Sequence, residues 1–207
     1  MRIITISREF GSGGREIGKR LADLFGFDYY DKEIVECVAQ KHGVEENYVE
    51  KALSNHGWAA VPLRYGRTFF TLPPVHTQTE LLLEERKVIE GIAALGKDCV
   101  IVGRNADVIL NEYNPFRLFV CAEMSAKIER CKQRGEETEN LSDKEIEMKI
   151  KKVDKLRKKV REYMTDKGFG QTKSYHLSVN TTGRDLKSLS ESLAEFIKVW
   201  FEEETCR

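Results

Sequence analysis

The sequence predicts an α/β fold in which a mainly parallel sheet is covered by helices. Short apolar runs alternate with amphipathic segments, an order typical of strands joined by right-handed helical crossovers. The run at 99–102, Cys-Val-Ile-Val, is apolar throughout, as expected of a strand buried on both faces. Polar clusters directly follow several predicted strands, which indicates that a ligand binds at the carboxyl edge of the sheet.

The first elements surround a glycine-rich turn. A strand is expected at 2–7, which is rich in β-branched residues, and a helix at 15–25, where apolar residues recur at helical spacing. The turn between them reads Gly-Ser-Gly-Gly (11–14). A short second strand is predicted at 27–30, and Asp31 follows it as a candidate helix cap.

The later elements continue this alternation. Strands are predicted at 99–102, 116–121 and 177–180, and helices at 45–53, 80–95, 125–134, 142–164 and 185–201. The helix at 142–164 begins with a capping-box pattern, because Ser142 is followed three residues later by Glu145. A chain of this length can bury one substantial core, so we expect a single domain over 1–207.

Two segments predict insertions into that domain. Residues 54–77 combine Gly and Pro with aromatic residues, which favours an insertion or flap at about 40–78. Residues 135–141 are polar and rich in Glu, and a highly charged helix follows them. Together these two stretches predict a lid at about 134–168.

The composition excludes several classes of function. The 34 basic and 34 acidic residues balance, so no long-range field favours a nucleic-acid partner. No apolar run is long enough to span a membrane, and no secretory signal is recognisable. The five cysteines lack metal-site spacing and are typical of reduced thiols in a cytoplasmic protein. We assign no residue to a metal, and the sequence does not specify an oligomeric state.

The glycine-rich turn has features of a phosphate-binding loop. Glycines let backbone N–H groups approach an anion, and the following helix start adds unpaired donors. A complete loop reads G-x-x-x-x-G-K-[ST]. Here Glu9 stands at the first glycine, Gly14 at the second, Arg15 at the lysine and Glu16 at the hydroxyl. Arg15 suits phosphate contacts, whereas Glu16 would hold a metal through water. The alternative is an ordinary strand-to-helix turn whose glycines permit tight packing.

Two more polar side chains follow predicted strands at the same edge. Arg104 comes after an apolar strand and Gly103, where it either clamps a phosphate or pairs with a carboxylate. Asp31 either contacts a ribose hydroxyl or a catalytic cation, or serves only as a helix cap.

The long charged helix sets Asp154, Arg157 and Arg161 along one face. One interpretation is a lid whose arginines close onto transferring phosphates, since such chemistry needs positioning and charge neutralisation in a dry site. The other is a solvated charged helix with no role in binding.

Four segments carry a family resemblance: Ile6–Gly18, Tyr30–Ile34, Val100–Asp107 and Leu177–Thr181. In combination they resemble the cytidylate kinase-like family of bacterial P-loop proteins. The resemblance implies a P-loop NTPase-type three-layer fold, similar to nucleoside monophosphate kinases, with a central parallel sheet, a flap and a lid. It also implies transfer of the γ-phosphoryl group of ATP to CMP or dCMP, with Mg²⁺.

The resemblance also implies roles for particular residues. The ATP site would consist of Gly11, Ser12, Gly13, Gly14, Arg15 and Glu16. The nucleoside monophosphate would meet Asp31, Arg104, Asn105 and Asp154. The developing negative charge would be spread over Arg15, Arg104, Arg157 and Arg161.

Two other functions stay open at this stage. The chain departs from the complete loop at Arg15 and Glu16, and it has Asn105 where cytidylate kinases have Asp. These departures favour a nucleotide-binding regulatory protein that has the kinase fold but little or no transfer activity. The second alternative is a kinase for another small metabolite, since a fold does not fix its substrate.

Overall fold

The computed structural model describes residues 1–31, 75–133 and 141–205. The helix predicted at 45–53 lies outside these residues, as do most of the predicted flap and residues 134–140 of the predicted lid. The predicted flap ends inside a helix, because α4 begins at Val75 rather than at residue 80. Its first turn contains His-Thr-Gln-Thr, which lacks the apolar spacing from which a helix is recognised.

Five strands form one parallel sheet in the order β2-β3-β1-β4-β5. Their bounds are β1 Ile3–Arg8, β2 Asp28–Tyr30, β3 Cys99–Val102, β4 Phe116–Cys121 and β5 Leu177–Asn180. The central strand pairs with two partners at once, since Ile4 is in register with Val100 on one side and Phe116 on the other. The predicted parallel sheet is confirmed, and all its carboxyl ends lie along one edge.

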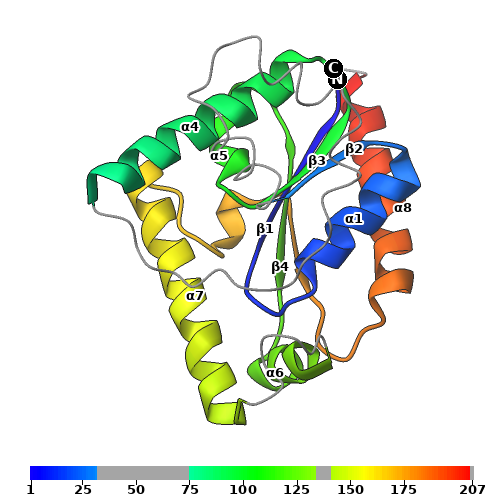
Figure 1. Ribbon diagram of the computed structural model, residues 1–207. Coiled ribbons are helices and arrows are strands. Elements are labelled where there is room, and N and C mark those ends of the chain that lie inside the picture. Colours follow the sequence, from blue (N-terminus) through cyan, green and yellow to red (C-terminus); the bar gives the residue numbers. More distant parts are fainter. Residues whose placement is uncertain (32–74, 134–140, 206–207) are drawn as a thin grey trace, which may run out of the picture.

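Helices cover both faces of the sheet (Figure 1). Their bounds are α1 Gly14–Phe25, α4 Val75–Ala94, α5 Ala106–Ile109, α6 Met124–Gln133, α7 Asp143–Met164 and α8 Leu186–Thr205, with 3₁₀ turns at Asn111–Tyr113 and Thr172–Ser174. On one face, α1 and α8 pack together against the strands, and α4 and α5 lie on the other. This is the three-layer α/β architecture that the family resemblance implies.

The alternation of side chains along β1 supplies both hydrophobic cores. Ile4 and Ile6 point into the core beneath α1 and α8, where they meet residues such as Leu21 and Ile197. Ile3 points to the opposite face and packs among residues of α4. The strand is buried on both faces, so its carboxyl end is held rigidly where the glycine-rich turn begins.

Candidate functional site

The glycine-rich loop lies at the carboxyl end of the central strand and leads directly into α1. Gly11 and Gly13 have φ angles of 74° and 84°, in the left-handed region that glycine adopts without strain. The buried Ser12 hydroxyl donates a hydrogen bond of 2.9 Å to the backbone oxygen of Glu9 and so closes the turn. Gly13 is the N-cap residue of the 12-residue helix α1. This geometry suits an anion, because the free N–H groups of a helix start point toward the loop.

Arg15 and Asp31 lie together beside this loop. Arg15 Nη2 is 2.6 Å from Asp31 Oδ2, and the Asp31 carboxylate is buried at the end of β2. The Tyr29 hydroxyl donates to the Arg15 backbone oxygen at 3.3 Å. Burial and the nearby Asp31 raise the pKa of Tyr29, which therefore stays a donor. Glu16 instead contacts Arg20 one turn along α1, at 2.9 Å.

The turn after β3 has an unusual backbone. Gly103, Arg104 and Asn105 all have positive φ angles, of 88°, 55° and 52°. Two consecutive non-glycine residues in this region store strain, a feature that clusters at functional sites. Arg104 pairs with the buried Glu85 of α4 at 3.0 Å, so the carboxylate partner considered from the sequence exists. Asn105 donates to the Met164 sulfur at the end of α7, at 3.2 Å.

The side chain of Arg8 is a part of the site that the sequence reasoning missed. A β-carbon on residue 103 would overlap Nη1 of Arg8, and one on residue 14 would lie 2.7 Å from the Arg8 β-carbon. The arginine is thus held between two glycines. Burial lowers its pKa, as do the guanidinium groups of Arg157 and Arg104. Within the described residues, its guanidinium makes no hydrogen bond or ion pair. One signal was available, a charged residue at the carboxyl end of a buried strand.

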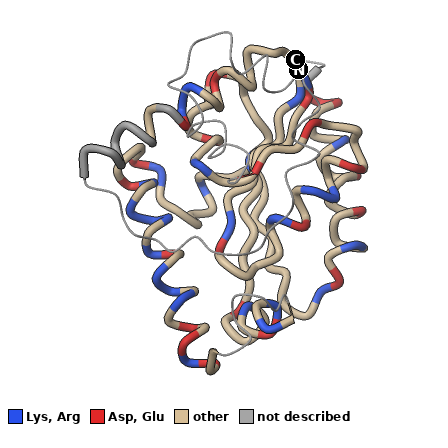
Figure 2. Tube along the Cα trace, viewed as in Figure 1, with Lys and Arg blue, Asp and Glu red and all other residues tan. Residues whose placement is uncertain are grey.

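The face of α7 that carries the predicted lid residues packs against the loop. Asp154 Oδ1 accepts a hydrogen bond of 2.7 Å from the Phe10 backbone N–H. Arg157 donates to the backbone oxygen of Arg8 at 3.0 Å and also contacts Asp154 at 3.3 Å. The pKa of Arg157 is lowered, chiefly because the side chain is buried. The neighbouring Asp154 raises this pKa and the positive charge of Arg104 lowers it. Elsewhere on this helix, acidic residues gather in the first turns and basic residues dominate from Lys149 onward (Figure 2).

Arg161 occupies a different environment from Arg157. Its guanidinium is fully buried and contacts both carboxylate oxygens of Asp107, at 3.0 and 2.8 Å. It also lies 5.2 Å from the centre of the Tyr175 ring. The contacts fasten α7 to α5, so the structure gives Arg161 a structural role. Its expected part in charge neutralisation stays a prediction.

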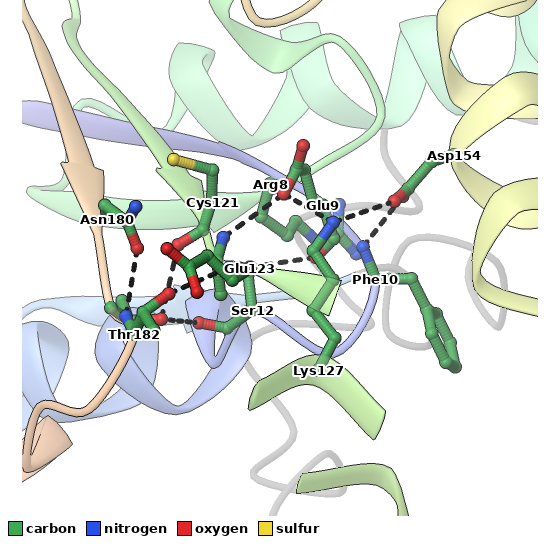
Figure 3. A network of polar contacts seen from close by, with 12 residues as sticks. Arg8, Glu9, Phe10, Ser12, Cys121, Glu123, Lys127, Asp154, Asn180 and Thr182 are labelled. Carbon is green, nitrogen blue, oxygen red and sulfur yellow. Dashed lines mark hydrogen bonds and ion pairs between the residues drawn. The ribbon is translucent and has the colours of Figure 1, made fainter. Parts of the chain in front are cut away.

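A second missed residue, Lys127 of α6, reaches the loop from below (Figure 3). Its Nζ lies 2.6 Å from Glu9 Oε2 and 3.7 Å from Asp154 Oδ2. The Ala122 backbone N–H donates to the same Glu9 oxygen at 3.2 Å. A lysine inside a charged helix carries no pattern that predicts burial, so sequence reasoning had no signal for this contact.

The structure thus brings Arg15, Asp31, Arg104, Asp154 and Arg157 together with the loop at one edge of the sheet. Among the described residues, no group of three or more His, Cys, Asp or Glu side chains is arranged to hold a metal ion. None of the helices in the described ranges is long and apolar enough to cross a membrane.

Solved structures with the same fold include kinases. An uncharacterized protein from Eubacterium ventriosum has a TM-score of 0.70 at 22% identity, covering 96% of this chain and 99% of that one. Shikimate kinase from Bacteroides thetaiotaomicron has a TM-score of 0.54 at 12% identity, covering 95% and 98%. Shikimate kinase from Acinetobacter baumannii, in complex with shikimate, has a TM-score of 0.52 at 11% identity, covering 96% and 94%. At these identities the likeness establishes the fold.

The family assignment comes from the sequence match. No curated protein matches the chain. The model of the cytidylate kinase-like family matches residues 3–183, which include the loop, the strained turn after β3 and the whole of α7. Family and fold together are those of a phosphotransferase, and the chain belongs to the cytidylate kinase-like family.

Proposed function

We propose that the protein transfers the γ-phosphoryl group of ATP to a nucleoside monophosphate, with CMP and dCMP as the favoured acceptors. The observation that carries the proposal is the cluster of Arg8, Arg104 and Arg157 beside the glycine-rich loop. Three guanidinium groups next to a helix start form a site for more than one phosphate. The family description favours a cytidine nucleotide as the acceptor.

The chain's own residues would act by position and charge. The loop at residues 9–14 would hold the phosphates of ATP through backbone N–H groups. An oxygen of the acceptor phosphate attacks the γ-phosphorus, the bond to the bridging oxygen breaks, and ADP leaves with that oxygen. Arg8, Arg104 and Arg157 would spread the negative charge that develops between the two nucleotides. Arg15 would turn from Asp31 toward the transferred group.

The magnesium ion in this proposal would be carried mainly by the phosphates of ATP and by water, as is usual for nucleotide-bound Mg²⁺. The carboxylate at the loop's hydroxyl position, Glu16, is engaged by Arg20, so it suits an outer contact through water better than a direct one. When bound, the ion would neutralise charge on the β- and γ-phosphates.

The test is ADP release in a coupled assay with ATP and Mg²⁺, screened against CMP, dCMP, UMP, AMP, GMP and dTMP. We expect turnover with at least one pyrimidine monophosphate. Arg15→Ala should abolish that turnover and leave the circular dichroism spectrum unchanged. Turnover with none of the six would contradict the proposal, and full activity of Arg15→Ala would remove Arg15 from the mechanism.

A second candidate function is nucleotide binding without efficient transfer. Two contacts favour it. Arg15, at the lysine position of the motif, is paired with Asp31, and the Phe10 N–H of the loop is bonded to Asp154. ATP binding by calorimetry, combined with no turnover in the screen, would support this function over the first.

A further inference from the structure

The loop carries a negative charge where a phosphate-binding loop has a glycine. Glu9 stands at that position, and an uncompensated carboxylate there would repel the phosphates of ATP. The structure turns this carboxylate toward α6, where Oε2 accepts from the Ala122 N–H at 3.2 Å and lies 2.6 Å from Lys127 Nζ (Figure 3). The negative charge of Glu9 is therefore compensated by Lys127, on the side of the loop that faces α6.

The lysine that opposes it is fixed in place. Only 7% of the Lys127 side chain is exposed. Its stem packs against the loop, since a β-carbon on Gly11 would lie 3.1 Å from the Lys127 β-carbon. A buried ammonium is retained only where carboxylates compensate it, and its removal would leave a partly buried carboxylate without its cation.

The same ammonium faces a second carboxylate from the lid helix. Asp154 Oδ2 lies 3.7 Å from Lys127 Nζ, while Asp154 Oδ1 accepts the Phe10 N–H at 2.7 Å. Phe10 belongs to the loop, so its N–H is one of the donors that a phosphate would use. The Asp154 carboxylate thus accepts from an N–H that a bound phosphate would use. Lys127 is the nearby cation that can form an ion pair with this carboxylate once it is displaced.

We propose that Lys127 is a positioning residue that prepares the phosphate loop to bind ATP. It neutralises the carboxylate of Glu9. It also pairs with the Asp154 carboxylate once a phosphate has displaced that carboxylate from the Phe10 N–H. The inference rests on the proposed function, because ATP is its ligand. Lys127 acts through Glu9 and Asp154 and need not touch the nucleotide. In this arrangement Lys127, which lies outside the loop, allows the loop to bind phosphate although the loop contains Glu9.

Calorimetric titration with MgATP tests the proposal in five proteins: wild type, Lys127→Met, Glu9→Gln, the double variant, and Lys132→Met. We expect Lys127→Met to weaken ATP binding about 10- to 100-fold, because Glu9 and Asp154 then face the phosphates with less compensation. Adding Glu9→Gln should restore most of the affinity, since it removes one of the two charges. Because Glu9→Gln would also relieve the structural cost of an unpaired carboxylate, the titrations are repeated at high salt: an electrostatic loss in Lys127→Met shrinks as salt is added, whereas a structural loss does not.

Lys132→Met is the matched control, since Lys132 lies on the same helix, half-exposed, and pairs with Asp143. It should bind ATP within about twofold of wild type. If Lys127→Met binds ATP as tightly as wild type, the inference is overturned but the proposed function is not. The same holds if Lys127→Met loses ATP affinity and adding Glu9→Gln does not restore it. If Lys127→Met does not fold, the double variant decides: a loss of more than about tenfold overturns the inference. A wild-type protein that binds no ATP overturns both the inference and the proposed function.

Discussion

Arg161 and Asp107 form a buried, two-pronged ion pair that joins α7 to α5. The Arg161 guanidinium has no exposed surface, and the Asp107 side chain is 4% exposed. Asp107 lies in α5, directly after the strained turn that carries Arg104. The pair therefore fixes the end of α7 relative to the arginines of the candidate site.

Breaking this pair should destabilise the protein strongly. Arg161→Met leaves a buried carboxylate without its cation, so we expect the free energy of unfolding to fall by about 3 to 5 kcal/mol in urea titrations. Lys158→Met on the same helix is the control. Lys158 is largely exposed and its Nζ is 3.9 Å from Glu162, so its loss should change stability by less than about 0.5 kcal/mol. Equal stability of the two variants would show that the buried pair is dispensable.

A methyl group at residue 103 should disturb acceptor binding. In Gly103→Ala the new β-carbon would overlap the Arg8 guanidinium, so Arg8 must leave its place between the glycines. We expect the Michaelis constant for the acceptor to rise about tenfold. Gly96→Ala is the control, because Gly96 also has a positive φ, of 68°, but nothing lies within 4 Å of its added carbon. An unchanged constant in Gly103→Ala would show that Arg8 takes no part in acceptor binding.

Replacement of Arg8 should separate stability from function. Burial and two neighbouring guanidinium groups lower the pKa of Arg8, so its charge is held at a cost to the folded protein. Arg8→Met removes that cost, and we expect the free energy of unfolding to rise by about 1 kcal/mol, seen as a melting temperature higher by about 2 to 4 °C. Acceptor affinity should fall in the same variant. Unchanged acceptor affinity in Arg8→Met would contradict the assignment of Arg8 as an anion-binding group.

His176 should make stability depend on pH. Burial and the nearby Arg117 lower the pKa of His176 from 6.5 to about 4. The imidazole ring stacks on the indole ring of Trp200, with 4.9 Å between the ring centres. Between about pH 4 and pH 6.5, the unfolded chain therefore binds a proton at His176 that the folded protein does not. This contribution to stability is complete above pH 6.5 and is lost as the pH falls toward 4.

His176→Phe keeps an aromatic ring and removes the titration. The stability difference between wild type and this variant should change by about 1 to 2 kcal/mol between pH 7 and pH 4, after allowance for the partial exposure of the ring. Urea unfolding at four or five pH values measures it. A difference that stays constant over this range would show that His176 titrates normally.

The fold was predictable where local pattern decides the structure. Strand β3 lies at the predicted residues, since its apolar run is bounded by Asp98 and Gly103. The capping box of α7 is formed as predicted: Ser142 Oγ accepts from the Glu145 N–H at 3.4 Å, and Ser142 N donates to Glu145 Oε2 at 2.8 Å. In both cases the decisive residues are neighbours in the chain.

The site was predictable in outline but not in its pairings. Residues that follow strands in a parallel sheet must meet at one edge, which is why Arg15, Asp31 and Arg104 could be grouped. Their partners depend on packing between elements distant in sequence, as with Glu85 for Arg104 and Asp107 for Arg161. Arg8 was missed because its significance comes from the two glycines beside it.

The sheet order also governs how the chain must fold. Strand β1 is the first of the five to be synthesised, yet its partners in register, Cys99 and Phe116, come roughly a hundred residues later. No neighbouring hairpin can nucleate this sheet, and closing such long loops costs entropy before any strand pairing compensates it. During synthesis an apolar strand stays without partners until β3 and β4 have left the ribosome. The central strand of the finished sheet is thus the element most in need of protection from aggregation while the chain is being made.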